Sequence, residues 1–257
     1  MMKKPSPKLL TVVSTETITP NMQRIVLHGN ALSDFPRDCD GGYIKLLFNA
    51  EGGTDLTSQQ EGQRPIMRTY TIRHFDAAAR TLEVDFVRHE TRDLSCGFAA
   101  RWAMSAQVGD TISIAGPGTI APINTDADWF FMVADMTALP ALSAKIKQLP
   151  EDARGYAVIQ VQSEQDQQAL TIPAHLEVLW VTEDKPLAEH VKAQPWLAGQ
   201  ASIWCACEFD SMRQLRQYFR NEKEVDRDFI YISSYWKQGV SEDGHKQIKK
   251  QDADSLA

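Results

Sequence analysis

The sequence of 257 residues predicts a two-domain protein, in which a six-stranded antiparallel β-barrel is followed by an open, mostly parallel α/β sheet. In the first half, short segments of alternating polar and apolar residues are separated by turns, a pattern typical of small barrels. After Asn124, apolar strands alternate with segments of helical periodicity, which is typical of an open α/β sheet. We therefore expect a barrel domain over residues 1–123, an α/β domain over 124–240 and a charged tail over 241–257.

The barrel strands are predicted from residue type and from alternation. Ile44, Leu46 and Phe48, for example, fall on one face of a strand, because successive side chains point to opposite sides. The six expected strands are Leu9–Ile18, Met22–His28, Tyr43–Phe48, a segment around residues 66–73, Thr81–His89 and Asp110–Ala115. The following Gly116–Ala121 segment fits a Gly-x-Gly-x-x-Ala dinucleotide pattern. Because Pro122 and Asn124 stand where a helix would begin, we interpret it as a barrel-closing turn instead.

In the second half, Trp129–Ala134 is a continuous apolar strand of the kind that is buried on both faces of a parallel sheet. Thr137 can cap the helix that follows, and Pro140 fits its first turn. The remaining expected elements are strands at Tyr156–Val161, Leu176–Val181, Ser202–Cys207 and Phe229–Ile232, and helices near Leu187–Val191 and Asp210–Phe219. In the last helix, Arg213, Arg216 and Arg220 are expected to face water. The tail over 241–257 is expected to be disordered or a solvated helix.

The composition is that of an ordinary globular protein, with 43% hydrophobic and 24% charged residues. The net charge of −7 argues against a general nucleic-acid-binding protein, because such proteins present basic surfaces to phosphates. No apolar segment has the length of a membrane span or the form of a signal peptide, so we expect a cytoplasmic protein. Cys39, Cys96, Cys205 and Cys207 lack the spacing of a zinc or iron–sulfur site, and the last two are interpreted as buried thiols.

The segment Arg68–Arg73 combines residue types that a flat anionic cofactor requires. Tyr, Thr and Ile favour a strand, and alternation places Arg68 and Tyr70 on one face and Thr69 and Thr71 on the other. An aromatic ring offers a stacking plane, hydroxyl groups offer hydrogen bonds, and guanidinium groups bind phosphate. Taken alone, the same residues also fit an amphipathic strand with solvated arginines.

The motif Arg-x-Tyr-Thr-x-Arg resembles the flavin-binding motif of the siderophore-interacting proteins, the FAD-dependent ferric-siderophore reductases of the ferredoxin–NADP reductase-like group. The resemblance extends over most of the chain. Other segments that are similar to the family are Asp85–His89, Gly97–Ala103, Gly109–Asp110 with Ala115–Pro117, Asp135–Ala141 and Tyr235–Gly239. Their order along the chain argues against chance similarity.

The resemblance implies a bound FAD. It assigns Arg68, Tyr70 and Thr71 to the isoalloxazine and ribityl part of FAD, and backbone amides near Ala99–Trp102, at a helix, to the pyrophosphate. His89 is a further candidate donor to the pyrophosphate, or else an ordinary surface histidine. The full set of expected FAD-binding residues is Arg68, Thr69, Tyr70, Thr71, Arg73, Asp85, Phe86, Val87, His89, Ala99, Ala100, Trp102 and Thr137.

The expected electron donor is NAD(P)H or a reduced ferredoxin. The resemblance assigns a weak nucleotide site to Asp135, Thr137 and Glu208. Two departures make that site doubtful: Met136 replaces the family's usual Glu, and Cys207 replaces its usual Gly. A side chain in place of Gly restricts close approach of the backbone to a ligand.

On the substrate side, the family uses a few cations to hold an anionic or hydroxamate-type ferric siderophore. Lys45 matches one of these positions, and Lys237 is a candidate in the C-terminal part. Gly118 stands where another cation usually follows Gly-Pro, so the basic cluster is incomplete or rebuilt. Either lysine can also be an ordinary solvated side chain.

We interpret the chain as an FAD-dependent ferric-siderophore reductase that releases iron as Fe(II), with a ferredoxin as a possible partner and without nucleic acid or a membrane span. One alternative is a flavin reductase that serves another electron acceptor, such as an oxygenase. A second alternative is a siderophore-binding carrier whose flavin is not catalytic. No metal-binding residues are expected, because no His, Asp and Glu cluster has ligand spacing.

Overall fold

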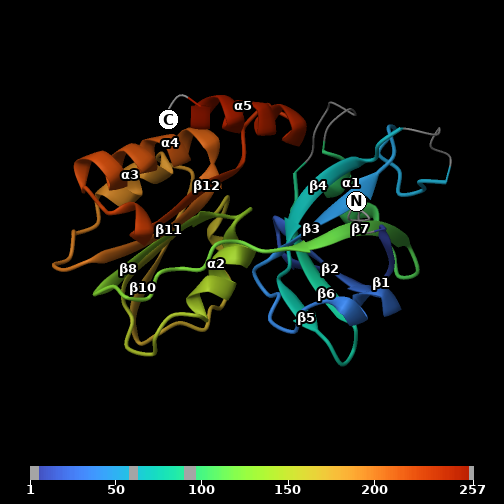
Figure 1. Ribbon diagram of the computed structural model, residues 1–257, viewed down its shortest axis with the longest axis horizontal. Coiled ribbons are helices and arrows are strands. Elements are labelled where there is room, and N and C mark those ends of the chain that lie inside the picture. The colour runs from blue at the N-terminus through green and yellow to red at the C-terminus, as the bar shows by residue number, and fades with distance from the viewer. Residues whose placement is uncertain (1–5, 58–62, 90–96, 255–257) are drawn as a thin grey trace, which may run out of the picture. The chain divides into compact units, whose positions relative to one another are not determined.

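The hairpin of β1 (Lys8–Thr19) and β2 (Met22–His28) opens an antiparallel sheet in the computed structural model, which describes residues 6–57, 63–89 and 97–254 (Figure 1). The chain divides into two units, Met1–Ile120 and Ala121–Ala257, each with its own sheet. No helix within the described residues is both long enough and apolar enough to cross a membrane.

The sheet of the first unit has seven strands in the order β4-β3-β7-β1-β2-β6-β5, and every neighbouring pair is antiparallel. The remaining strands are β3 (Tyr43–Phe48), β4 (Ile66–Thr71), β5 (His74–Asp76), β6 (Thr81–Val87) and β7 (Thr111–Gly118). The antiparallel domain predicted from the sequence is confirmed. The additional strand, β5, has only three residues and is too short to show an alternating pattern.

The sheet of the first unit curls back on itself. β4 and β6 are not neighbours in the strand order, yet the rings of Tyr70 and Phe86 have centroids only 4.4 Å apart. Side chains of the concave face form one core, which includes Ile44, Leu46 and Phe48 from the predicted inward face of β3. Helix α1 (Phe98–Ser105) contributes Phe98 and two alanines to the same core, and a 3-10 turn, η1 (Asn30–Asp34), contributes Leu32.

The Gly116–Ala121 segment is not a turn. Gly116, Pro117 and Gly118 form the end of β7 and pair with β3 across a register shift, and no helix follows them. The rejection of a dinucleotide-binding loop is therefore confirmed, while the predicted turn is wrong. The sequence signal was misleading because Gly and Pro mark irregular strand ends as well as turns.

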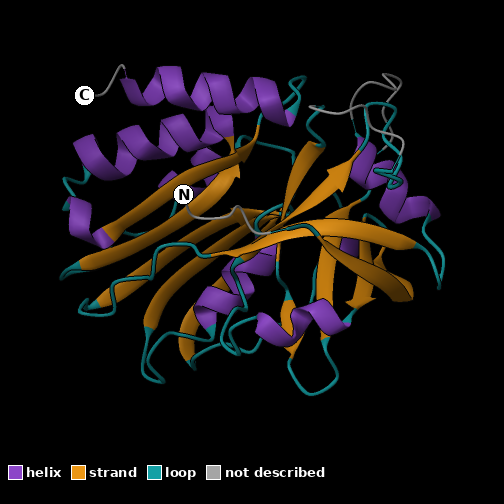
Figure 2. Cartoon of the chain, turned by 45° about the vertical axis from the view of Figure 1, so that its right-hand side comes forward, coloured by secondary structure: helices purple, strands orange, loops and turns teal. Residues whose placement is uncertain are grey.

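The second unit contains a parallel sheet in the order β10-β9-β8-β11-β12. Its strands are β8 (Trp129–Asp135), β9 (Arg154–Gln160), β10 (His175–Val181), β11 (Ala201–Glu208) and β12 (Ile230–Trp236). Its helices are α2 (Leu139–Ile146), α3 (Leu187–Lys192), α4 (Phe209–Gln217) and α5 (Glu242–Asp254), with short turns η2 (Glu164–Asp166), η3 (Tyr218–Glu222) and η4 (Arg227–Phe229). The α2 helix covers one face of this sheet, and α3, α4 and α5 lie on the other (Figures 1 and 2).

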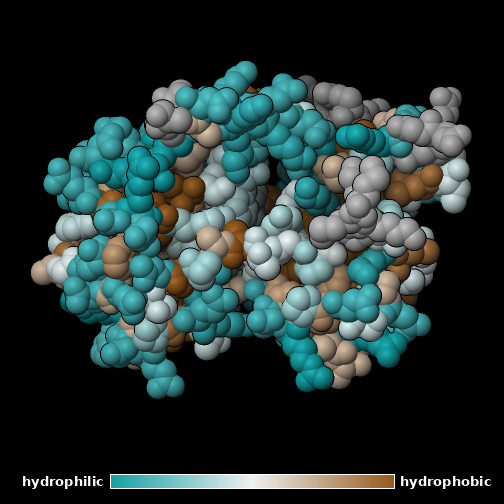
Figure 3. All heavy atoms as spheres, viewed as in Figure 1, coloured by the Kyte–Doolittle hydropathy of each residue, from teal (hydrophilic) through white to brown (hydrophobic). Residues whose placement is uncertain are grey.

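β8 is buried along its whole length, as its continuous apolar sequence predicts. Trp129, Phe131 and Val133 pack in one core with Leu215 and Phe219, which follow each other at helical spacing in α4 and η3. The outer surface over α4 and α5 is mainly hydrophilic (Figure 3).

The described part of the C-terminal tail is an ordered helix that is not fully solvated, because α5 packs against β12. His245 is buried, and its Nε2 lies 2.8 Å from the Oγ of Ser234 on β12. Asp252, near the end of α5, accepts two hydrogen bonds from Arg216 of α4 at 2.7 and 2.9 Å. The expectation that Arg216 faces water is therefore wrong, since α5 covers that side of α4.

Candidate functional site

The motif Arg68–Arg73 forms β4 and the residues directly after it, with the predicted alternation. The guanidinium of Arg68 is almost buried, and its Nη1 donates to the backbone oxygen of Met67 at 2.9 Å. Thr69, on the opposite face, is exposed. The cross-strand register places Tyr70 opposite Ile44 of β3. The Tyr70 side chain packs against the core and is half-exposed.

A row of three aromatic rings connects β4 with α1. The ring of Tyr70 lies 4.4 Å from that of Phe86, and the ring of Phe86 lies 5.8 Å edge-on from that of Trp102. Phe86 is fully buried, whereas Tyr70 and Trp102 are half-exposed. The Phe86 ring therefore supports its two neighbours from behind, and the predicted FAD-binding role of this residue stays a prediction.

The N-terminus of α1 is strongly electropositive. Helix α1 follows Gly97, which has φ 66° and no side chain to accept a hydrogen bond from the first turn. The amides of Ala99 and Ala100 lie in this first turn, where helix geometry provides no backbone acceptor. The guanidinium groups of Arg68 and Arg101 lie 5.7 and 5.2 Å from the ring centroid of Phe98, the first helical residue. Two cations therefore stand beside the positive end of a helix dipole.

Arg101 was missed by sequence reasoning as a site residue. The signal that could have found it is its spacing of three positions from Phe98, which puts both side chains on one side of a helix. Trp102, in contrast, is one turn into α1, so its amide donates within the helix and only its ring can contact a ligand.

The carboxylate of Asp85 is paired with arginines. It accepts hydrogen bonds from Nε and Nη2 of Arg24, the residue opposite on β2, at 2.7 and 2.9 Å. The Nε of Arg73 lies 3.7 Å from the same carboxylate, whose side chain is only 1% exposed. Asp85 therefore holds two arginines in place, and its predicted role at the FAD site stays a prediction. Of the two arginines, Arg24 and Arg73, Arg73 lies two residues beyond the end of β4. It stays a candidate for binding the phosphate groups of FAD.

Val87 and His89 lie at and just beyond the end of β6. Val87 is half-exposed, and the exposed His89 has its Nδ1 3.2 Å from the backbone oxygen of Val87. The imidazole is thereby turned toward its own strand end. Their predicted roles at the FAD site stay predictions, because the next segment of chain, 90–96 with Cys96, lies outside the described residues.

A second face of the same strands carries the predicted substrate lysine. Lys45 of β3 is half-exposed and pairs in register with Thr69 of β4 and Ala115 of β7. Partners in register share a face, so Lys45 and Thr69 lie side by side on the surface opposite Arg68 and Tyr70. A lysine in this place can bind an anion next to the flavin motif.

At position 118, where the sequence has Gly instead of a cation, the neighbouring ring of Tyr43 leaves no room for a side chain. Tyr43 pairs in register with Gly118, and a Cβ atom at Gly118 would collide with the Tyr43 ring. The phenol ring of Tyr43 therefore occupies the space where the family's usual side chain would begin. An aromatic ring, and not a cation, fills the space at this position.

In the second unit, Asp135 joins three segments at the carboxyl end of the parallel sheet. Its Oδ1 accepts hydrogen bonds from the amide and hydroxyl of Thr137 and from the amide of Ala138. Its Oδ2 accepts from the amide of Glu208 at 2.8 Å and from Nε1 of Trp236 at 2.7 Å. Burial raises the pKa of the Asp135 carboxyl, while these five donors favour its charged form.

This arrangement changes the predicted nucleotide site. Both carboxylate oxygens of Asp135 accept hydrogen bonds from within the protein, and its predicted contact with a nucleotide stays a prediction. Thr137 does not cap α2, because α2 begins after Ala138 and the Thr137 hydroxyl donates to Asp135 instead. The predicted contacts of Thr137 with FAD and nucleotide are not tested by this geometry. Asp135 and Thr137 together shape the loop at the sheet edge.

Glu208 and Lys237, predicted to bind nucleotide and substrate, both interact with other residues of the second unit. The Oε2 of Glu208 caps α4 by accepting from the amides of Asp210 and Ser211, and its Oε1 accepts from the amide of Gln238. Lys237 pairs with Asp210 at 2.7 Å, so its charge is largely neutralised. A carboxylate therefore already occupies the helix N-terminus where a phosphate would bind.

Met136 and Cys207 fill the same edge of the sheet. Both are buried, and the Met136 sulfur lies 3.5 Å from the amide of Gln162. Cys205 and Cys207 are buried free thiols of β11, as predicted. Neither departure from the family pattern leaves an open cradle for a nucleotide.

The residues of the first unit fit a flavin cofactor. FAD requires a stacking plane and a cationic pocket for its pyrophosphate, and the half-exposed ring of Tyr70 and the amides of α1 beside Arg68 and Arg101 provide these. The start of α1 is the most direct sign, because no side chain of the described residues caps it and its first amides can donate to an acceptor outside the helix.

Two family models match the chain. Residues 11–121 match the siderophore-interacting FAD-binding domain, and residues 127–239 match the siderophore-interacting protein. Together they span most of both units.

Relatives of this chain match over nearly its full length. It is 32% identical to the ferric vibriobactin reductase ViuB of Vibrio cholerae, over 94% of this chain and 93% of that protein. It is 29% identical to the NADPH-dependent ferric-chelate reductase of Escherichia coli, over 88% of this chain and 91% of that protein. The crystal structure of the siderophore-interacting protein SipS from Aeromonas hydrophila aligns with a TM-score of 0.83 and 34% identity, covering 96% of this chain and 98% of that one.

Proposed function

Because this chain belongs to the siderophore-interacting protein family and is an FAD-dependent oxidoreductase, we propose that it reduces Fe(III) in a ferric siderophore to Fe(II). The observation that carries the proposal is the cluster of Arg68 and Arg101 at the N-terminus of α1, together with the half-exposed ring of Tyr70. The printed name of the V. cholerae relative, a ferric vibriobactin reductase, supports the choice of electron acceptor.

Bound FAD supplies the electrons for this reduction. The residues of the chain hold, orient and charge-balance the reactants. Arg68 and the first amides of α1 hold the negative pyrophosphate, and the Tyr70 ring provides a plane that Phe86 supports from behind. Lys45, beside Thr69, attracts the anionic ferric complex. Reduced iron leaves because Fe(II) is held far less tightly than Fe(III) by hard oxygen ligands.

The test is anaerobic reduction and reoxidation of the purified flavin-loaded protein. We expect the yellow colour to bleach under dithionite and to return when a ferric siderophore is added, with Fe(II) appearing in a colorimetric trap. Gallium-loaded siderophore, which cannot be reduced in this way, is the control. Binding of the ferric complex without return of colour would identify a carrier instead of a reductase. Return of colour only with a different acceptor would identify another flavin reductase.

We expect nicotinamide nucleotides to be poor electron donors. The edge where a nucleotide binds in open α/β sheets is filled by Met136 and Cys207, and Glu208 already caps α4. Stopped-flow reduction of the flavin should show half-saturation at about 1 mM nucleotide, the upper end of the usual range for substrates.

NADPH, NADH and a reduced ferredoxin are compared in the same experiment. The E. coli relative is named as NADPH-dependent, so NADPH is the nucleotide to test first. Rapid, saturable reduction at micromolar NADPH would show that the substitutions at 136 and 207 do not matter. Faster reduction by the ferredoxin would point to a protein donor.

Lys45→Ala is expected to weaken binding of an anionic ferric siderophore by roughly fivefold, or about 1 kcal/mol at low salt. The salt dependence of binding should flatten at the same time, because the Debye length is about 8 Å at physiological ionic strength. Lys8→Ala is the matched control, since Lys8 lies on β1 and pairs with Asp34 at 3.5 Å. Equal affinities of wild type and Lys45→Ala at both salt concentrations would make Lys45 an ordinary surface lysine.

A further inference from the structure

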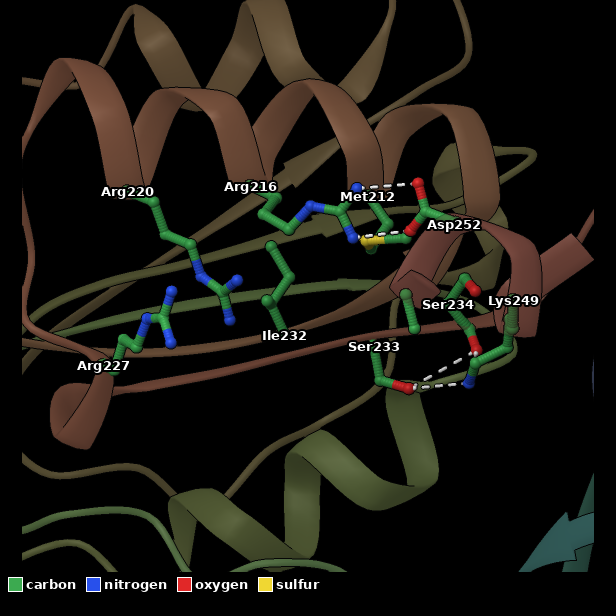
Figure 4. A pocket seen from close by; sticks show the side chains of 10 residues that line it. Met212, Arg216, Arg220, Arg227, Ile232, Ser233, Ser234, Lys249 and Asp252 are labelled. Carbon is green, nitrogen blue, oxygen red and sulfur yellow. Dashed lines mark hydrogen bonds and ion pairs between the residues drawn. The ribbon is translucent and has the colours of Figure 1, made fainter. Parts of the chain in front are cut away.

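A basic groove in the second unit has no role in the proposed function. It lies between α4 with its following turn η3, the strand β12 and the C-terminal helix α5, and its volume is about 440 Å³ (Figure 4). We define the basic groove by its polar lining residues Arg216, Arg220, Arg227, Ser233, Lys249 and Asp252. Four cations and one carboxylate thus meet in a protein whose net charge is −7.

The single carboxylate neutralises only one side of the groove. Asp252 accepts both of its short hydrogen bonds from Arg216, and Arg213 lies 3.4 Å from it on the outer side. Lys249 donates to uncharged groups, the Oγ of Ser233 at 3.1 Å and the backbone oxygen of Ser234 at 2.9 Å. The ammonium group of Lys249 is therefore oriented by the groove and forms no ion pair with any described residue.

Arg220 and Arg227 face each other at the other end of the groove (Figure 4). No hydrogen bond or ion pair involves either guanidinium among the described residues, and the Nε of Arg220 is buried without any partner. Burial lowers the pKa of Arg220, and repulsion from Arg216 and Arg227 adds to this effect. Burial also lowers the pKa of Lys249.

Such an arrangement opposes folding. A buried donor that lacks an acceptor costs free energy, and like charges in contact add to that cost. Arg227 is exposed and Arg220 is half-exposed, so water reaches part of both guanidinium groups, while the Nε of Arg220 lacks any partner. Like charges gathered in a groove with an unpartnered donor are typical of ligand sites, where a group supplied from outside provides the missing interactions.

We propose that the basic groove binds an organic phosphate monoester, with its phosphoryl group between Arg220 and Arg227. A phosphoryl group has three terminal oxygens and matches guanidinium forks in geometry, so it can accept from both arginines at once. Lys249 and the Ser233 hydroxyl lie on the far side as further donors. Met212 and Ile232 form an apolar part of the lining, against which the organic group can pack. The volume also exceeds the needs of a bare phosphate and falls within the usual range for small-molecule sites.

The experiment is isothermal titration calorimetry of the full-length, flavin-loaded protein at low ionic strength. The probes are phenyl phosphate, benzoate and phenol, which share a ring and differ in the attached group. We expect saturable binding of phenyl phosphate, binding of benzoate at least tenfold weaker, and no binding of phenol. Benzoate that binds as tightly as phenyl phosphate would overturn the choice of phosphate, and phenol that binds equally would overturn an anion site.

Arg220→Gln and Arg227→Gln locate the site. Each should weaken phenyl phosphate binding at least tenfold, while Lys246→Gln should not, because Lys246 is on α5 but does not line the groove. Without ligand, Arg220→Gln should unfold at the same or a higher temperature than wild type, since it removes the repulsion from Arg216 and Arg227. Unchanged binding in both arginine variants would overturn the proposal. A lower unfolding temperature of unliganded Arg220→Gln would assign this arginine to structure and overturn it as well.

Discussion

Asp135→Ala is expected to lower the free energy of unfolding by about 3–5 kcal/mol. The substitution leaves the amides of Thr137 and Glu208 and the indole of Trp236 without their carboxylate acceptor in a partly buried place. Unpaired buried donors of this kind cost about 1–3 kcal/mol each, and partial entry of water limits the sum. Urea unfolding of the purified variant, followed by tryptophan fluorescence, measures the change.

Asp210→Ala is the matched control for Asp135→Ala. Asp210 is also an aspartate at the sheet edge, but it is exposed and its partner is the single ammonium of Lys237. We expect its loss to cost no more than about 1 kcal/mol, as for other exposed ion pairs. Equal effects of the two substitutions would contradict the view that Asp135 joins three segments of the second unit.

Arg68→Ala is expected to weaken flavin binding by about 1.5–3 kcal/mol, or roughly 10- to 100-fold, because it removes a charge-assisted contact beside the α1 N-terminus. Tyr70→Ala should also weaken flavin binding, since this variant loses the stacking plane and uncovers the ring of Phe86. Flavin content after purification, and the dissociation constant for added FAD measured by fluorescence quenching, report both effects.

Two further variants separate a cofactor role from a folding role. Tyr70→Phe keeps the ring next to Phe86, so it should retain most of the flavin. Arg88→Ala removes an arginine that follows β6 and donates to Thr17 of β1, away from the proposed contacts. Normal flavin content in Arg68→Ala and Tyr70→Ala would exclude β4 from the site. Equal loss in Arg88→Ala would show that any disturbance of this sheet releases the cofactor.

Much of the fold could be predicted because long strands and helices carry their own periodicity. β2 and β3 begin and end at the predicted residues, and the apolar β8 was recognised by composition alone. β5 could not be found, since three residues show no pattern. The end of β7 was read as a turn because Gly and Pro are common in both settings.

The candidate site could be predicted only in part. A motif identifies residue types, and β4 does present Arg68 and Tyr70 on one face. The motif does not give the strand register. Only the pairing of β2 with β6 shows that Arg24 forms an ion pair with Asp85. Helical periodicity likewise shows which side of α4 avoids the core, but it cannot show that α5 will cover Arg216 on that side.

The contact between Tyr43 and Gly118 couples two positions that lie 75 residues apart in the sequence. In a chain with this tyrosine, a side chain at position 118 meets the ring at its first atom, so the ring must move to admit it. A smaller residue at position 43 opens the space instead. A change at one of the two positions therefore favours a change at the other. Homologues with a cation after Gly-Pro should carry a smaller residue in place of Tyr43.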